Sequence, residues 1–157
     1  MLVALMAVAS WAVNNDQYTI IVSLDGFRWD YCEAYNTPFL NSMAEKGVKA
    51  VMSPSFPSKT FPNHYTLATG LVPDHHGIIA NSFRIRATGK KYSLGNAETR
   101  SDIRNYGGDP IWLTAKRQGM TTATVYWGGS EIPIKGDNAT YWQDYQKKPL
   151  LTDVERA

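Results

Sequence analysis

The sequence predicts an α/β fold in which a largely parallel sheet is flanked by helices. Runs rich in β-branched and aromatic residues occur at 18–24, 48–52 and 121–126, and helical stretches with a proline near the start and a glycine after the end lie between them. The order strand, helix, strand, helix, helix, strand fits crossover connections between parallel neighbours. Sites in such sheets lie at the carboxyl ends of strands, so we expect Asp25, Thr60 and Trp127 to converge on one edge.

The first predicted strand covers residues 18–24, YTIIVSL, and its nearly continuous apolar character suits a strand covered on both faces. It ends at Asp25-Gly26. A helix follows, with Thr37 as N-cap, Pro38 at its first position and Gly47 after its last turn. A short strand is predicted at 48–52.

The second predicted helix begins at Phe61-Pro62 and runs to about Thr69, where Gly70 ends it. The preceding loop, residues 53–59, contains two prolines and three serines, which exclude regular structure. These boundaries place Thr60 at the amino-terminal edge of the helix.

For the second half of the chain, the sequence predicts fewer helices and strands. Residues 84–109 are polar, contain several glycines and are expected to form an irregular surface excursion. A third helix is predicted at 110–118, with proline in its first turn and Gly119 after its end, and a strand follows at 121–126.

Composition indicates one globular domain. The chain has 157 residues, of which 43% are hydrophobic and 19% charged. The 16 basic and 14 acidic side chains are spread without a run of like charges, which argues against a nucleic-acid duplex as partner. Cys32 is the sole cysteine, so it forms no internal disulfide, and a small half-buried apolar residue is its favoured role.

Residues 1–13, MLVALMAVASWAV, resemble the later part of a signal peptide, with small residues that suit a cleavage site. The stretch lacks a basic start and is too short to span a bilayer, so we expect a secreted or periplasmic protein without stable membrane insertion. A gene start placed at an internal Met would produce the same pattern.

Pattern alone leaves alternatives open for the polar residues. Asp25 directly after an apolar strand suits a metal-binding carboxylate, but Asp-Gly is also an ordinary turn. Thr60 lies where a helix N-terminus favours an anion, but a simple capping role is commoner. Structural roles are favoured for His64, His75 and His76, with His64 turned away from the site one helical turn beyond Thr60.

Four ordered blocks carry a family resemblance. The segment 55–81, SFPSKTFPNHYTLATGLVPDHHGIIAN, together with IVSLDGFRWDY, GGDPIWLTAKRQG and YWGGSE, resembles the nucleotide pyrophosphatase/phosphodiesterases of the alkaline phosphatase superfamily. The resemblance extends over residues 18–145. It implies an alkaline-phosphatase-like fold that is incomplete here, with residues 18–157 as the amino-terminal part of the catalytic domain.

The resemblance also implies a reaction. Phosphodiester or pyrophosphate bonds in nucleotides or related small diesters are cleaved through a phospho-threonine intermediate on Thr60. Asp25 and Thr60 match ligands of one of two zinc ions, and Asn81 matches the side chain that donates a hydrogen bond to a nonbridging phosphate oxygen.

Three aromatic residues match the wall of the family's nucleotide pocket. They are Phe61, Trp127 and Tyr145, on which a base can stack, with core packing as the alternative for each. The family commonly has proline where this chain has Gly128, so we expect a looser loop beside Trp127.

The family's remaining ligands lie in a D-x-x-G-H element, an Asp-His pair and a final His, and none of them is present in this sequence. We therefore expect a fragment that is inactive alone. The alternatives are a noncatalytic truncated product or nucleotide-binding remnant, and the same fold acting on lipid phosphodiesters or phosphomonoesters. Phe61 beside the nucleophile argues against a simple phosphatase, because it favours an organic group that can stack.

Overall fold

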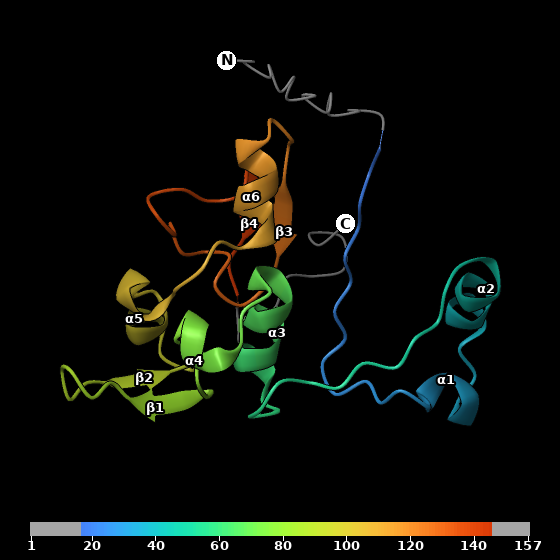
Figure 1. Ribbon diagram of the computed structural model, residues 1–157, viewed down its shortest axis with the longest axis horizontal. Helices are drawn as coiled ribbons and strands as arrows, with labels where there is room; N and C mark the ends of the chain where they lie inside the picture. The colour runs from blue at the N-terminus through green and yellow to red at the C-terminus, as the bar shows by residue number, and fades with distance from the viewer. Residues whose placement is uncertain (1–16, 146–157) are drawn as a thin grey trace, which may run out of the picture.

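A computed structural model describes residues 17–145 of the chain (Figure 1). Along it, groups of short helices are followed by pairs of short strands. The helices are α1 (Tyr31–Ala34), α2 (Pro38–Lys46), α3 (Thr60–Thr69), α4 (Pro73–His76), α5 (Ala97–Arg100), the 3₁₀ helix η1 (Ile103–Asn105) and α6 (Ile111–Arg117). The strands are β1 (Ser82–Arg84), β2 (Lys91–Ser93), β3 (Ala123–Val125) and β4 (Tyr141–Gln143).

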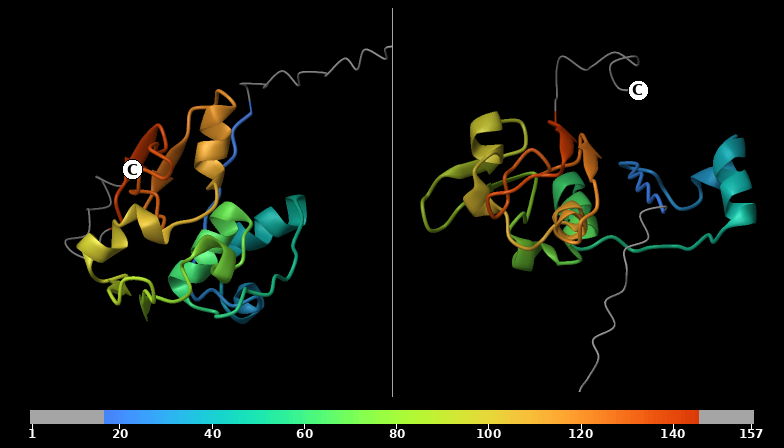
Figure 2. Two further views of the ribbon diagram at one scale, coloured as in Figure 1. Left: turned by 60° about the vertical axis from the view of Figure 1, so that its left-hand side comes forward. Right: turned by 90° about the horizontal axis from the view of Figure 1, so that it is seen from above.

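The packed body of the protein is built around α3, which contacts α4 and α6 (Figures 1 and 2). Phe61, Tyr65 and Ala68 on α3 are buried, and the rest of the core comes from residues further along the chain. By contrast α1 and α2 contain no buried residue and lie apart from this body (Figure 1). The apolar core within the described residues therefore begins at Phe61, the residue after the candidate nucleophile.

Two small sheets are present. β1 pairs with β2 as an antiparallel hairpin, with Phe83 opposite Tyr92. β3 pairs in parallel with β4, with Thr124 opposite Trp142. The parallel pair leads directly into the loop that carries Trp127, so its carboxyl end is placed beside the start of α3.

The predictions based on local helix signals are confirmed. α2 begins at Pro38 and is followed by Gly47, and α6 occupies most of the predicted 110–118 segment. α3 ends at Gly70, whose φ of 70° is the left-handed conformation that glycine adopts without steric cost. The strand predicted at 121–126 is present as β3.

The strands predicted at 18–24 and 48–52 are wrong for the described residues, because neither segment pairs with a neighbour. Their apolar side chains are largely exposed, with Ile20 84% and Val48 94% accessible. A strand exists only when its backbone N–H and C=O groups find a partner strand, and β-propensity does not supply one.

The irregular excursion predicted at 84–109 is also wrong in part. It contains β2, α5 and η1, and it places Tyr92 and Tyr106 in the core, where their hydroxyls are 3.1 Å apart. Burial raises the pKa of Tyr92 to about 12, so this hydroxyl stays protonated at neutral pH. The two tyrosines in this polar, glycine-rich stretch are the sequence feature that could have predicted its partial burial.

Other expectations concern exposure and the amino terminus. Cys32 is partly buried, as predicted. The signal-peptide prediction for residues 1–13 lies outside the described residues. Among residues 17–145, no helix has the length and apolar character needed to cross a bilayer.

Candidate active site

The Thr60 hydroxyl lies beside the Asp25 carboxylate. Thr60 is the first residue of α3, and its Oγ1 donates a hydrogen bond of 3.3 Å to Asp25 Oδ2. The capping alternative for Thr60 is wrong, because Lys59 is the N-cap residue of α3. The hydroxyl therefore projects from a helix N-terminus, where unpaired backbone N–H groups favour a nearby anion.

Asn81 is brought against the same helix start from a segment twenty positions away. Its Oδ1 accepts a hydrogen bond of 3.0 Å from the backbone N–H of Phe61, the residue that follows Thr60. Because the carbonyl side of the amide is used in this contact, the remaining group of Asn81 is the Nδ2 donor. Asn81 is thus held against the backbone of the residue that directly follows Thr60.

A cavity of about 450 Å³ opens beside Thr60, and Asn81 is not among the residues that line it. Asp25 and Thr60 line it, together with residues 21–23, the start of α3 and the loop that follows β3. The predicted convergence of Asp25, Thr60 and Trp127 is thus confirmed. A cavity of this size is in the range that holds a small organic ligand.

The three predicted aromatic residues all line this cavity. The rings of Phe61 and Tyr145 meet edge to face with centroids 5.2 Å apart. Trp127 is fixed by a hydrogen bond of 3.0 Å from its Nε1 to the backbone carbonyl of His64, and its ring packs edge-on against Trp112. Phe61 also belongs to the core and is only 2% exposed, so pocket lining and core packing are combined in one side chain.

Gly128 lies against the tip of the Phe61 ring. A Cβ atom at this position would lie 2.9 Å from the tip of the Phe61 ring. The expectation of a loose loop at Gly128 is therefore wrong: the residue is buried, and the missing side chain makes room for the aromatic ring beside the nucleophile.

The histidines differ from one another. The expectation that His64 points away from the site is wrong, because it lines the cavity, with Nδ1 2.8 Å from the Thr60 carbonyl oxygen. His75 is exposed. His76 has the predicted structural role: it is fully buried, with Nε2 3.0 Å from Thr66 Oγ1, and burial lowers its pKa.

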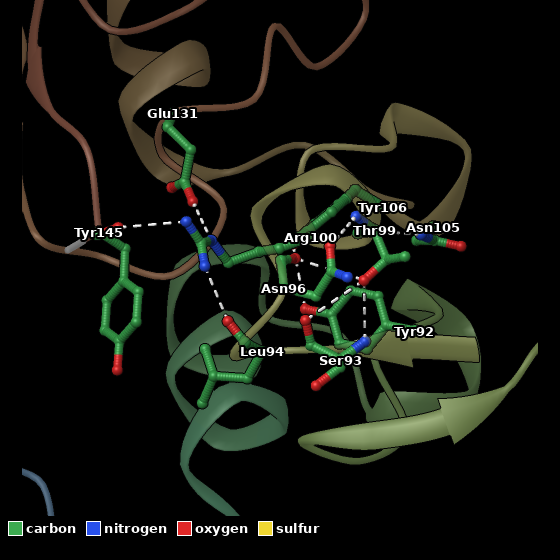
Figure 3. A network of polar contacts seen from close by, with 10 residues as sticks. All are labelled: Tyr92, Ser93, Leu94, Asn96, Thr99, Arg100, Asn105, Tyr106, Glu131 and Tyr145. Atoms are coloured by element: carbon green, nitrogen blue, oxygen red, sulfur yellow. Dashed lines mark hydrogen bonds and ion pairs between the residues drawn. The ribbon is translucent and has the colours of Figure 1, made fainter. Parts of the chain in front are cut away.

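A polar network behind the aromatic wall was not predicted from the sequence (Figure 3). Arg100 and Glu131 form an ion pair of 2.9 Å, and their side chains are 12% and 5% exposed. Burial raises the pKa of Glu131, and the ion pair with Arg100 opposes that shift. Arg100 looked like one charge in a polar loop, so the sequence offered no signal for this contact.

The residues at the site offer part of a metal-binding sphere. The Asp25 carboxylate and Thr60 hydroxyl are adjacent oxygen donors and fit one metal ion as two of its ligands. Within residues 17–145, no group of three or more His, Cys, Asp or Glu side chains is arranged to hold a metal. The described chain thus presents an incomplete set of ligands.

Solved structures with similar folds include the murine ectonucleotide pyrophosphatase/phosphodiesterase 5, both unmodified and as an inactive threonine-to-alanine variant in complex with AMP. The AMP complex matches with a TM-score of 0.73 and 34% identity over 82% of this chain and 34% of that one. The human protein of the same name matches with a TM-score of 0.72 and 36% identity. The chain thus has the α/β, alkaline-phosphatase-like fold of these domains over the part that it covers.

Similar sequences come from several organisms. An uncharacterized pyrophosphatase/phosphodiesterase of Schizosaccharomyces pombe is 44% identical over 78% of this chain and 26% of its own length. Ectonucleotide pyrophosphatase/phosphodiesterase family member 3 of Mus musculus is 40% identical, and venom phosphodiesterase 2 of Crotalus adamanteus 41%. The chain spans 15% and 16% of the lengths of these two relatives.

The sequence pattern of one family, type I phosphodiesterase / nucleotide pyrophosphatase, matches residues 19–156, which is nearly the whole chain. The chain therefore belongs to the type I phosphodiesterase / nucleotide pyrophosphatase family, a family of hydrolases.

Proposed function

We propose that this chain supplies the nucleophile and the substrate-binding wall of a hydrolase that cleaves phosphodiester or pyrophosphate bonds in nucleotides or related small diesters. The observation that carries the proposal is the Thr60 hydroxyl, which lies 3.3 Å from a carboxylate at the start of a helix and opens into a cavity with an aromatic wall. The threonine-to-alanine variant of the murine relative, described as inactive, supports a threonine nucleophile.

The reaction begins when Thr60 Oγ1 attacks phosphorus. The hydroxyl proton passes to water, an Oγ1–P bond forms, and the bond from phosphorus to the leaving oxygen breaks. The leaving group departs as an oxyanion that water protonates, and the phosphoryl group is carried on the threonine. Water then cleaves the Oγ1–P bond and frees Thr60. The Nδ2 group of Asn81 and the N-terminal N–H groups of α3 stabilise the charge that develops on the nonbridging oxygens.

Asp25 and Thr60 are the residues that would hold one of two zinc ions in the complete site. Bound zinc lowers the pKa of an attacking hydroxyl and stabilises a leaving oxygen. A helix N-terminus alone contributes roughly 1 kcal/mol, far less than is needed to form an alkoxide near neutral pH. Since the described residues hold no complete set of ligands, we propose that residues 18–157 form the amino-terminal part of the catalytic domain and are inactive alone.

The proposed substrate is a nucleotide diester. The edge-to-face pair of Phe61 and Tyr145, with Trp127 across the same cavity, offers flat apolar surfaces on which a base can stack. The murine relative was solved with AMP, a nucleotide product of such cleavage. We further propose that the protein acts outside the cytoplasm, because relatives are named for venom and as ectoenzymes and because residues 1–13 resemble a signal peptide.

A chimaera tests the class of reaction. In it, residues 19–145 replace the corresponding segment of the murine relative, whose remaining part continues the domain. We expect it to hydrolyse bis(p-nitrophenyl) phosphate well and p-nitrophenyl phosphate poorly, and we expect no turnover after Thr60→Ala. A folded chimaera that prefers the monoester would contradict the proposal, and a preference for a lysophospholipid over a nucleotide would favour the lipid alternative.

The role of Asn81 is tested in the same chimaera. Asn81→Ala should lower turnover about 10²-fold, because one donor to the charged oxygen is lost. Asn81→Asp keeps an oxygen that can accept the Phe61 N–H but removes the Nδ2 donor, and it should be at least as damaging. Recovery of turnover in the Asp variant would show that Asn81 acts only by supporting the backbone at Phe61.

A further inference from the structure

The ion pair between Arg100 and Glu131 is buried behind the aromatic wall (Figure 3). Arg100 is the last residue of α5, and Glu131 lies in the loop between β3 and β4. A buried ion pair stabilises a fold little compared with apolar side chains of similar size. We therefore ask which neighbouring groups the ion pair holds in position.

The Arg100 guanidinium makes several contacts at once. Its Nε donates to Glu131, its Nη1 donates to the backbone carbonyl of Leu94 at 2.7 Å, and its Nη2 donates to the backbone carbonyl of Tyr145 at 3.3 Å. Its central carbon also lies 5.4 Å from the centre of the Tyr145 ring. One rigid planar group thus contacts both the backbone and the ring of Tyr145.

Tyr145 connects Arg100 to the cavity. Its ring meets Phe61 edge to face at 5.2 Å, and both rings line the cavity that contains the Thr60 hydroxyl. A continuous series of contacts therefore runs from the buried Glu131 carboxylate through Arg100 and Tyr145 to Phe61, the neighbour of the nucleophile.

We propose that Arg100, oriented by Glu131, is the positioning residue of the aromatic wall and thereby determines the selectivity of this site for substrates that carry an aromatic base. The inference rests on the proposed function, since it concerns how the same cavity distinguishes its substrates. Arg100 does not line the cavity and acts through Tyr145. A lysine at this position would keep the positive charge but could not make the forked set of contacts.

Two variants and a matched control test the proposal in the 157-residue chain. Arg100→Lys removes the fork, and Glu131→Gln keeps the size of the side chain while removing the charge that orients Arg100. Arg104→Lys is the control: it is the same substitution four residues later, at an arginine that is 68% exposed, pairs with Asp102 and does not line the cavity. Circular dichroism checks that each variant is folded.

The first measurement needs no ligand. With 3-fluorotyrosine incorporated, the fluorine resonance of Tyr145 is identified by its loss in Tyr145→Phe. We expect this resonance to shift and broaden in Arg100→Lys and in Glu131→Gln, and to stay unchanged in Arg104→Lys. An unchanged Tyr145 resonance in both folded Arg100→Lys and Glu131→Gln would overturn the proposal.

The second measurement compares the binding of AMP with that of ribose 5-phosphate, which lacks the base. We expect Arg100→Lys to weaken AMP binding about five- to tenfold and to leave ribose 5-phosphate binding unchanged, because only the stacking surface is disturbed. Equal effects on both ligands, or none on either, would overturn the inference alone. Binding of neither ligand by the unaltered chain would overturn the proposed function as well.

Discussion

At the scale of single residues, the site depends on the absence of a side chain at Gly128 as well as on the side chains that line the cavity. Gly128 is buried against Phe61, and a Cβ there would lie 2.9 to 3.1 Å from three atoms of the aromatic ring. The ring cannot retreat easily, because Phe61 is itself part of the core. The position of the residue next to the nucleophile is therefore set by a glycine in a distant loop.

Substitution of Gly128 tests this dependence. Gly128→Ala should push the Phe61 ring toward the cavity and raise the KM for a nucleotide diester about tenfold in the chimaera, as overpacking by one methyl group costs about 1–3 kcal/mol. Gly95→Ala is the matched control, because a Cβ at this position would lie 3.9 Å from its nearest neighbour, Ser93 Oγ. Equal KM values in the two variants would contradict the close packing.

His76 makes stability depend on pH. Burial lowers its pKa below the ordinary value of 6.5, so the unfolded chain binds this proton more readily than the folded one. Its contribution to the free energy of unfolding is present above pH 6.5 and is lost as the pH falls through the folded pKa. Urea unfolding should therefore show a loss of stability between pH 7.5 and pH 5 that is smaller in His76→Gln. An identical pH dependence in the variant would contradict this assignment.

At the scale of elements, local signals at helix ends predict the helices correctly, whereas contacts between separate segments are not predicted. Pro38 and Gly47 around α2, and Gly70 after α3, are local signals, and they led to the correct helices. The burial of Tyr106 depends on contacts with residues far away in the sequence, such as Tyr65, which periodicity does not reveal.

The same distinction applies to the candidate site and to the predicted strands. The contact between Asp25 and Thr60 was predicted from the rule that sites lie at the carboxyl ends of parallel strands. The two side chains do form a hydrogen bond, although residues 18–24 form no strand in the described chain. The Arg100–Glu131 ion pair joins positions thirty-one residues apart, and no local sequence pattern predicts it.

Two helix-ending glycines with different surroundings give the prediction at this scale. Gly70 after α3 and Gly77 after α4 both have positive φ, but a Cβ on Gly70 would meet nothing within 4 Å, whereas one on Gly77 would lie 2.6 Å from the Asn105 carbonyl oxygen. Gly70→Ala should cost about 1 kcal/mol of unfolding free energy, and Gly77→Ala about 3 kcal/mol. Equal losses in chemical denaturation would show that α4 and η1 are not closely packed.

At the scale of the whole molecule, residues 17–145 combine a packed body with apolar segments that pair with no other strand of the described part. The body from Thr60 onward carries the candidate nucleophile and pocket, whereas Ile20, Val22 and Val48 are largely exposed. The chain covers 34% of the solved murine relative. We therefore propose that this chain provides the nucleophile and the substrate-binding wall, and that residues outside the described part complete the metal site.

The central claim is that Thr60 becomes covalently attached to the phosphoryl group, and acid-quench mass spectrometry of the chimaera with a nucleotide diester tests it most directly. We predict a nucleotidyl mass increase on the peptide that contains Thr60, its absence in Thr60→Ala, and its absence in the 157-residue chain alone. Turnover of the diester with no adduct at Thr60, or an adduct that persists in Thr60→Ala, would contradict the account.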